Sequence, residues 1–386
     1  MYFLRLRCAL RTAYDEIGDF RFDYPLRIVP EAGPKNSLYY YLYKYRKTPP
    51  RRPVMRLDSN GVPRVWGRVT GEVYRPSFIA MYGLSNLNQF LATGDPTKRD
   101  IFLTQVAWLE NHAVQREDGA VVWPHDFDLQ EGPLLLKAPW ISANVQGFVI
   151  SALVRAFRLT GRPALYELLM RSTKVFHRDW TDHGIRVRSE GHVVYTEAPG
   201  LPAPGIMDGF LRSLLGLYDL WVETGDSRVY RLFEEGIDGL RYFLSRWDYK
   251  HKWSIYGNNA YLCPPAYHHL NRLLLQCTAR ITNNGRFERC AENWNPAFLS
   301  KSDRAEIYAM FVITKNACRI RYRTWNQRGS DLAPSHIPSS LRVQRSRTSQ
   351  DCTAPPTAKY QPDPVFPFCC SDSRKVGAVD RANLPD

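Results

Sequence analysis

Residues 191–220 read G-H-V-V-Y-T-E-A-P-G-L-P-A-P-G-I-M-D-G-F-L-R-S-L-L-G-L-Y-D-L, and this stretch decides the fold. It begins with a β-like alternation that places Tyr195 and Glu197 on the same side of an extended segment. A Pro/Gly-rich loop follows, and a strongly apolar helix begins at Ile206. A carboxylate and a phenol held just before a buried helix are suited to proton transfer.

The plan of this stretch recurs along the chain. A Pro-led apolar segment leads to a Thr-Gly pair and then to a second helical segment, with the pairs at Thr93, Thr160 and Thr224 and a degenerate fourth unit reaching Thr282. The first helix of each unit is apolar nearly all round, and the second is amphipathic. Buried inner helices within half-exposed outer helices predict an α/α toroid, that is, an incomplete α/α barrel of helix-pair repeats with small β-hairpin elements. The long loops should gather at one end, where we expect the site.

The flanking regions differ in composition from the repeats. We expect three parts: a basic, aromatic arm over residues 1–75 with a hairpin near 58–73, the toroid over residues 76–323, and a disordered tail over residues 324–386. A shifted reading frame is the alternative for the tail. The arm carries a basic cluster of Lys44, Arg46, Lys47, Arg51 and Arg52. It is equally consistent with a rim that grips an anionic chain and with a segment packed on the toroid.

The composition narrows the function classes. The 386 residues carry a formal net charge of +14, which favours a polyanionic partner without choosing among kinds of polyanion. The eight cysteines show no metal-like spacing with histidine, so we expect neither a metal nor a cofactor. No signal peptide or membrane span is evident, which favours a cytoplasmic location or leaves the compartment unknown. The oligomeric state stays open, a homodimer included.

Several motifs together resemble the C-terminal domain of the D-glucuronyl carbon-5 epimerases, which act on heparosan and heparan-type polysaccharide. They are V-W-P (122–124), P-W-I-S-A-N-V-Q-G (139–147), E-A-P (197–199), D-G-F-L-R-S-L-L-G-L-Y-D-L (208–220), S-I-Y (254–256) and A-Y-H-H-L-N-R-L (266–273). The resemblance spans roughly residues 75–300, and the two longest motifs carry most of its specificity. It implies an isomerase on an α/α scaffold, in agreement with the repeats.

The resemblance also implies a catalytic set of Glu197, Tyr256 and Tyr267. Three departures accompany it. Ala198 stands where the family has a tyrosine, asparagines at 258 and 259 stand where it has an arginine for the substrate carboxylate, and the segment around Tyr267 is two residues shorter.

Epimerisation at carbon 5 removes a proton alpha to a carboxylate and returns one from the opposite face. This requires a base, an acid and donors around the carboxylate. We assign Glu197 and Tyr267 to opposite faces, and Tyr256 to the developing enediolate or to a proton relay. Tyr195 could replace the phenol missing at Ala198, or could simply cover the edge of the domain. The expected substrate-binding residues are Tyr195, Trp123, Gln146, His268 and Asn271.

Structural roles are the alternatives for several of these residues. Gln146 and Asn144 could bond to backbone, Trp123 could belong to the core, and Asp208 is best interpreted as a helix N-terminal feature.

Other functions remain open as well. A uronate lyase would share the proton abstraction, and a hydrolase would need a second carboxylate such as Asp126 or Asp128. A non-catalytic polysaccharide-binding protein is the third alternative. Nucleic-acid binding is disfavoured because no recognition motif appears. We therefore expect an anionic, uronate-containing polysaccharide as the partner.

Overall fold

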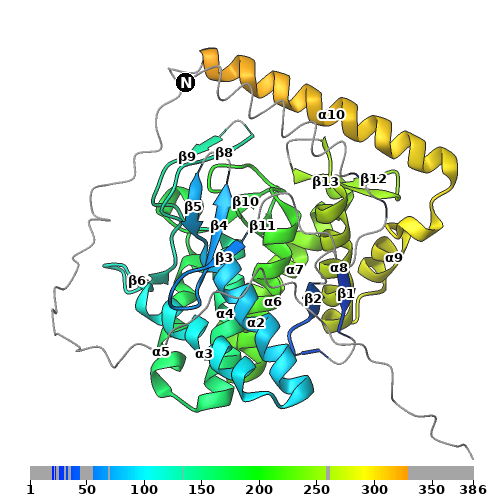
Figure 1. Cartoon of the computed structure of the whole chain (residues 1–386). Helices are drawn as coiled ribbons and strands as arrows, with labels where there is room; N and C mark the ends of the chain where they lie inside the picture. Colours follow the sequence, from blue (N-terminus) through cyan, green and yellow to red (C-terminus); the bar gives the residue numbers. More distant parts are fainter. Residues whose placement is uncertain are drawn as a thin grey trace, which may run out of the picture.

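Four helix pairs follow one another in the computed structural model, which describes residues 20, 22, 26–29, 32–33, 36–43, 55–67, 70–132, 134–257 and 261–328. The pairs are α2 (Pro76–Thr93) with α3 (Pro96–Asn111), α4 (Ala143–Thr160) with α5 (Pro163–Ser172), α6 (Met207–Thr224) with α7 (Ser227–Phe243), and α8 (Pro265–Thr282) with α9 (Gly285–Asn293). A further helix, α10 (Lys301–Arg328), follows the last pair and crosses the molecule above the strands (Figure 1).

The predicted Thr-Gly pairs end the first helix of each of the first three units. Gly94, Gly161 and Gly225 adopt left-handed backbone with φ of 73°, 66° and 68°, and Asn283 takes the same role in the fourth unit with φ of 48°. Glycine and, less often, asparagine adopt this conformation with little strain. Side-chain oxygens then cap the next helix, for example Asp95 on Thr97 N. Tight turns of this kind make the two helices of a pair antiparallel neighbours.

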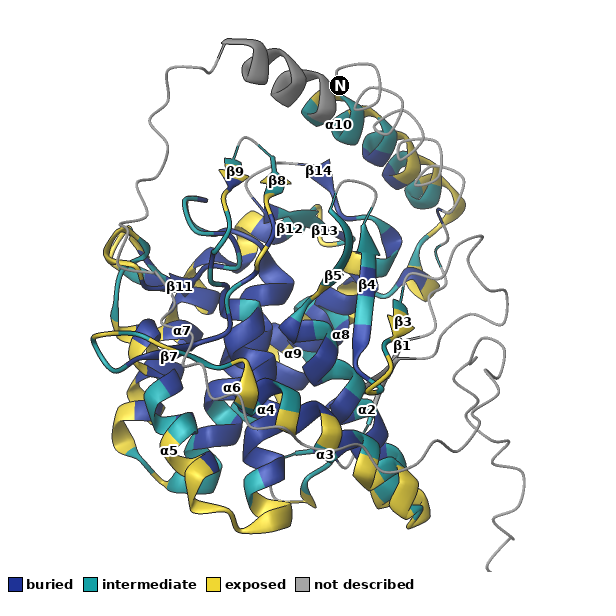
Figure 2. Ribbon diagram, turned by 60° about the vertical axis from the view of Figure 1, so that its left-hand side comes forward, coloured by how far each residue is buried: buried dark blue, intermediate teal, exposed yellow. Residues whose placement is uncertain are grey.

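Helices α2, α4, α6 and α8 form the inner layer, and their residues make up most of the buried core (Figure 2). Helices α4 and α6 touch backbone to backbone: a Cβ added to Gly147 would lie 2.6 Å from Ser213 Cα, and one added to Gly216 would lie 2.7 Å from Gly147 Cα. The outer helices are amphipathic, with one buried face. The predicted α/α toroid is confirmed.

Residues 36–41 of the arm pack between the first and last inner helices. The backbone of Tyr39 exchanges two hydrogen bonds with the Asn88 side chain of α2, and the Cys277 thiol of α8 donates to Tyr40 O. Arg280 of α8 donates to the carbonyls of Val29 and Ala32. For these residues the structure favours the packed segment over the gripping rim. The basic cluster at 44–52 lies outside the described residues.

Among the described residues, most short strands lie where the inner helices begin, whereas the sheet nearest the N-terminus lies beside the second half of α8. They form six antiparallel sheets: β1 (Leu26–Ile28) with β2 (Tyr41–Tyr43); β3 (Met55–Leu57), β4 (Pro63–Gly67) and β5 (Gly71–Tyr74); β6 (Val114–Gln115) with β7 (Val121–Val122); β8 (Leu129–Glu131) with β9 (Leu134–Leu136); β10 (Arg186–Ser189) with β11 (His192–Tyr195); and β12 (Asp248–Tyr249), β13 (Trp253–Tyr256) and β14 (Tyr261–Leu262). The hairpin expected near 58–73 is β4–β5.

The two ends of the toroid therefore differ. We call the end where α2, α4, α6 and α8 begin the loop end, because the long connections lie there, and the opposite end the turn end (Figure 1). Helix α10 joins the loop end through Ile307 and Phe311, which pack on Trp253 and Leu262. Because α10 continues to Arg328, the first residues of the expected tail are helical, and residues 329–386 lie outside the described part of the chain. Over the described residues, no helix has the length and apolar character needed to cross a bilayer.

Candidate active site at the loop end

Glu197 lies against the first turn of α6. Strand β11 ends at Tyr195, and backbone hydrogen bonds from Ala143 N to Thr196 O and from Thr196 N to Ile185 O fix the chain just before the glutamate. Gly209 makes room for the side chain, since a Cβ at this position would lie 2.7 Å from Glu197 Cβ and 2.8 Å from its Cδ. The carboxylate is thereby held over the N-terminus of an inner helix.

A chain of polar contacts connects Glu197 to Asp208. Asn144 Nδ2 donates to Glu197 Oε1 at 3.1 Å, and Arg212 Nη1 donates to Asn144 Oδ1 at 3.1 Å and to Asp208 Oδ2 at 3.0 Å. The guanidinium of Arg212 lies over the ring of Phe148 at 4.8 Å. The positive charge of Arg212 therefore acts on both carboxylates, those of Glu197 and Asp208.

Burial raises the pKa of Glu197, and the nearby Asp208 carboxylate raises it further, while Arg212 and the Asn144 hydrogen bond act in the opposite direction. Burial also raises the pKa of Asp208. Glu197 Oε2 is buried and has no hydrogen-bond partner among the described residues. A carboxylate with a raised pKa and an unoccupied oxygen is suited to accept and release a proton near neutral pH.

Three tyrosines form a second group at the loop end. The rings of Tyr256 and Tyr261 stack at 5.0 Å, and Tyr267 meets the Tyr256 ring edge to face at 5.5 Å. Lys315 of α10 places its ammonium 3.7 Å from the centre of the Tyr261 ring. The side chain of Tyr267 is 42% exposed, and its pKa is raised by desolvation and then by the charges of Asp208 and Glu197. Tyr267 is therefore a protonated phenol within electrostatic reach of both carboxylates.

Arg75 and His125 complete the polar groups at this end. The guanidinium of Arg75 lies 4.8 Å from the centre of the Phe127 ring. Burial and the Arg75 charge lower the pKa of His125 to about 3, so the imidazole is neutral, and its ring packs on Trp140 at 4.1 Å. Over the described residues, no group of His, Cys, Asp and Glu side chains is arranged to hold a metal ion.

The structure brings Glu197, Tyr256 and Tyr267 to the loop end, but it places the five expected substrate-binding residues in the core. Tyr195 is 1% exposed, and its hydroxyl donates to Leu232 O at 2.7 Å. The alternation that placed it beside Glu197 fails because β11 ends at Tyr195. Tyr195 therefore does not replace the phenol missing at Ala198.

The other four are also engaged in hydrogen bonds within the protein. Trp123 donates to Leu109 O at 2.6 Å, and Gln146 donates to Val121 O and Ser172 O. His268 accepts from Ser254 N, contacts Trp294 O and stacks on Trp253. Asn271 donates to Ser254 Oγ and Cys263 Sγ. These four side chains are therefore not expected to contact substrate.

The sequence-based prediction missed Arg212, Arg75 and His125, and it gave Asp208 a purely structural role. It considered Asn144 as a residue that could bond to backbone, but Asn144 bonds to the side chains of Glu197 and Arg212. A signal was present: Arg75 immediately precedes α2, and Asn144, Asp208 and Arg212 lie in the first two turns of otherwise apolar inner helices. Because these helices all begin at the same end, polar residues at their N-termini converge there.

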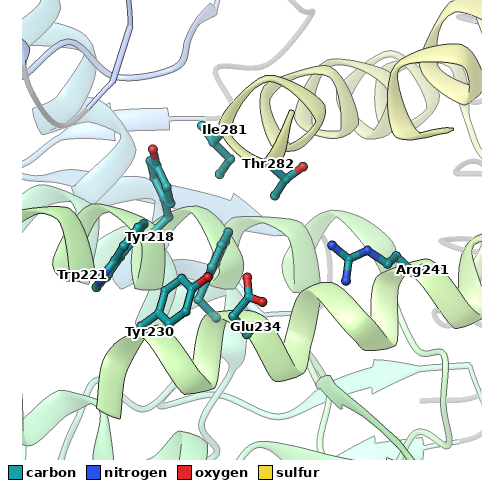
Figure 3. Close-up of a pocket in the computed structure, with 8 residues that line it drawn as sticks. Tyr218, Trp221, Tyr230, Glu234, Arg241, Ile281 and Thr282 are labelled. Carbon is teal, nitrogen blue, oxygen red and sulfur yellow. The ribbon is translucent and has the colours of Figure 1, made fainter. Parts of the chain in front are cut away.

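A separate cavity of about 170 Å³ lies toward the turn end (Figure 3). It is lined by Tyr218, Trp221, Tyr230, Phe233, Glu234, Arg241, Ile281 and Thr282. Tyr218 and Trp221 follow Asp208 by ten and thirteen residues on α6, which corresponds to ~15–20 Å along the helix. The cavity is therefore distinct from the candidate active site.

The central part of the chain is similar to a family of known proteins. Residues 117–296 match the family described as D-glucuronyl C5-epimerase C-terminus. This match confirms, for this part of the chain, the resemblance inferred from the motifs.

Two curated relatives match about half of the chain. A D-glucuronyl C5-epimerase of Caenorhabditis elegans is 27% identical over 211 residues, which are 50% of this chain and 34% of that protein. An uncharacterized protein of Methanocaldococcus jannaschii is 23% identical over 207 residues, which are 51% of this chain and 66% of that protein. The matched part thus spans about a third of the length of the epimerase.

Among solved structures, a glycoside hydrolase family 76 mannosidase from Bacteroides thetaiotaomicron aligns with a TM-score of 0.43 and 11% identity, over 71% of this chain and 77% of that one. A D-mannose isomerase aligns with a TM-score of 0.39 and 11% identity, over 75% and 68% of the two chains.

Proposed function

We propose that this chain is an isomerase that converts D-glucuronate residues to L-iduronate by epimerisation at carbon 5 within an anionic, heparosan-like polysaccharide. The observation that carries the proposal is Glu197. Its carboxylate has a raised pKa, and its Oε2 has no hydrogen-bond partner among the described residues. Its charge acts on Tyr256 and Tyr267, and all three residues lie in the part of the chain that matches the glucuronyl C5-epimerase family.

In the proposed reaction, ionised Glu197 accepts the proton from carbon 5, and the electron pair of the C–H bond moves into the carboxyl group to form an enediolate. The O–H of Tyr267 then delivers a proton to carbon 5 from the opposite face, which gives the inverted centre. Tyr256 donates a hydrogen bond to the enediolate. Exchange with water, which reaches the 42% exposed Tyr267, restores the protonation states. General acid–base catalysis by two such groups contributes typically 10²–10⁴-fold.

Because residue 198 is an alanine, the proposed catalytic set contains only Glu197, Tyr256 and Tyr267. Ala198 is 2% exposed and packs in a small apolar cluster at the loop end with Trp140 and Ile206. No phenol comes from this position, so the two remaining tyrosines take the acid and donor roles.

The hydrolase alternative has less support. Asp128 forms an ion pair with Lys137 at 2.6 Å, and Asp126 is exposed, so neither is placed as a partner of Glu197. Lyase chemistry uses the same first step and differs only in expelling the group at carbon 4.

The test is incubation with a glucuronate polymer in deuterated water, followed by NMR. Deuterium at carbon 5 with the appearance of iduronate is expected. Glu197→Gln should reduce the exchange by about 100-fold or more, whereas Glu167→Gln, which alters an exposed glutamate on α5, should not. A new double bond would identify a lyase and shortened chains a hydrolase. Binding without any exchange would identify a binding protein, and each of these three results would overturn the proposal.

A further inference from the structure

Arg75 occupies the junction between β5 and α2. Its backbone is extended, with φ of −121° and ψ of 109°, because Pro76 at the first helical position disfavours helical backbone in the residue before it. Its carbonyl accepts hydrogen bonds from Phe78 N and Ile79 N, which complete the first turn of the helix. The side chain is thus carried by a rigid element at the loop end, like those of Asn144, Asp208 and Tyr267.

The guanidinium of Arg75 has no anionic partner among the residues that the structure describes. Within the described residues, no carboxylate lies within 4 Å of it, and its Nε is buried without a hydrogen-bond acceptor. The side chain is only partly exposed and rests on the Phe127 ring. An unsatisfied buried donor destabilises a fold, so a further hydrogen-bond acceptor at this side chain would be stabilising.

Its electrostatic neighbours are the groups proposed to move protons. The charge interactions that act on Arg75 come from Tyr267 and Glu197. The guanidinium of Arg212, by contrast, already bonds to Asp208 and Asn144. Of the two arginines, Arg75 is therefore the one that forms no ion pair within the described residues, and its partly exposed guanidinium can donate hydrogen bonds to a substrate carboxylate.

We propose that Arg75 binds the carboxylate of the uronate residue at the active site and neutralises the charge that develops on it, an inference that rests on the proposed function. Removal of the carbon 5 proton leaves two negative charges on the former carboxylate. A guanidinium already in place offsets this charge without reorganisation during the reaction. The sequence has asparagines at 258 and 259, where the family resemblance would place an arginine, so Arg75 supplies this function from a different element.

The test compares binding to a glucuronate polymer with binding to its carboxyl-reduced form, in which glucose replaces glucuronate. Calorimetry is performed on wild type, Arg75→Gln, Arg75→Lys and Arg64→Gln. Arg64 is a matched control on neighbouring β4 that forms an ion pair with Glu72. Wild type should prefer the carboxylate polymer, and Arg75→Gln should reduce this preference by about 10- to 100-fold. Arg75→Lys should restore part of it, and Arg64→Gln should leave it unchanged.

In the deuterium assay, Arg75→Gln should raise KM and lower kcat together, because the guanidinium contacts the carboxylate before and during the reaction. Unchanged preference for the carboxylate in Arg75→Gln would overturn the role of Arg75, even if wild type epimerises. Conversely, a preference that depends on Arg75 in a protein without exchange at carbon 5 would support the binding role and overturn the epimerase. Thermal melting confirms that each variant is folded. If Arg75→Gln unfolds, Arg75→Lys still tests the proposal, because it should show a smaller but measurable loss of preference for the carboxylate polymer.

Discussion

Two buried Arg–Asp pairs lie on the inner helices, one toward each end of the toroid, and they differ in how many of their polar atoms are hydrogen-bonded: one connects α4 to α6, and the other lies within α6. At the turn end, Arg155 of α4 contacts Asp219 of α6 at 2.5 Å, and every nitrogen of its guanidinium donates a hydrogen bond, including bonds to the carbonyls of Ser37 and Leu38. Tyr40 adds a hydroxyl donor to Asp219 at 2.5 Å. At the loop end, Arg212 contacts Asp208 at 3.0 Å, but its Nε has no partner among the described residues.

This difference distinguishes buried polar groups that stabilise the fold from buried polar groups that are available to bind substrate. The turn-end pair fixes the arm to the inner helices and leaves none of the guanidinium nitrogens unused. At the loop end, Glu197 Oε2, His125 Nδ1 and the Nε atoms of Arg75 and Arg212 are all without partners in the described part of the chain. Unsatisfied buried polar atoms are uncommon in native proteins. Others occur elsewhere in the described residues, such as Gln105 Oε1 and Ser151 Oγ, but at the loop end they belong to the proposed catalytic carboxylate and to the charged groups around it, as a substrate-binding site predicts.

The largest expected effect comes from a matched pair of Asp→Asn substitutions. Asp219→Asn leaves the charge of Arg155 buried without a counter-charge, which should reduce the free energy of unfolding by about 3–5 kcal/mol. Asp208→Asn should cost less, because burial already raises the pKa of Asp208 and because the charge of Glu197 also acts on Arg212. Urea unfolding followed by tryptophan fluorescence at pH 7 measures both.

Activity should rank the same two variants in the opposite order. Asp219→Asn should retain the exchange rate per folded molecule. Asp208→Asn removes a negative charge that raises the pKa of Glu197, so the acid limb of its pH–rate profile should move to lower pH. Equal stability losses in the two variants, or an unmoved profile in Asp208→Asn, would contradict the distinction between the two ends.

A smaller effect is expected from two glycines of the inner helices. Gly147→Ala places a methyl group against the backbone of α6, which cannot move locally, and should cost about 1–3 kcal/mol. Gly209→Ala meets only the Glu197 side chain, and the gain in helix propensity offsets part of its cost. Gly209→Ala should instead lower the exchange rate about 100-fold by displacing the carboxylate. Thermal melting and the deuterium assay should therefore rank these variants differently.

The fold could be predicted from sequence because its signals are local. The pairs at Thr93, Thr160 and Thr224 end helices through left-handed glycines, and an apolar segment of nearly constant length precedes each pair. Helix α10 and the packing of the arm could not be predicted in the same way, because both depend on contacts between residues far apart in the chain. The hydrogen bonds from Asn88 to Tyr39 and from Arg155 to Ser37 are examples.

The site could be predicted only in part. Glu197, Tyr256 and Tyr267 follow from the family resemblance, and the repeats place them at the loop end. Burial of Trp123 and Gln146 could not be inferred, because an aromatic or amide side chain in a motif looks the same whether it faces substrate or core. Arg75 and Arg212 went unrecognised because their role depends on which partners they lack or share, and this is a property of the three-dimensional arrangement.

The smallest expected effect is the pH dependence of stability at Glu197. The ordinary pKa of this side chain is 4.5 and burial raises it in the folded state, so between these two values the unfolded chain ionises while the folded chain stays protonated. Stability contributed by the protonated form is therefore complete below pH 4.5 and declines as the pH rises toward the folded pKa. Glu197→Gln cannot ionise, so its stability relative to wild type should increase across this window, by about 1–2 kcal/mol once partial exposure is considered.

Melting temperatures from pH 4 to pH 8 measure the trend, with Glu167→Gln as the control that should show none. A constant difference between Glu197→Gln and wild type across this range would mean that the loop-end carboxylate ionises normally, and the contrast with the satisfied turn-end pair would lose its electrostatic basis.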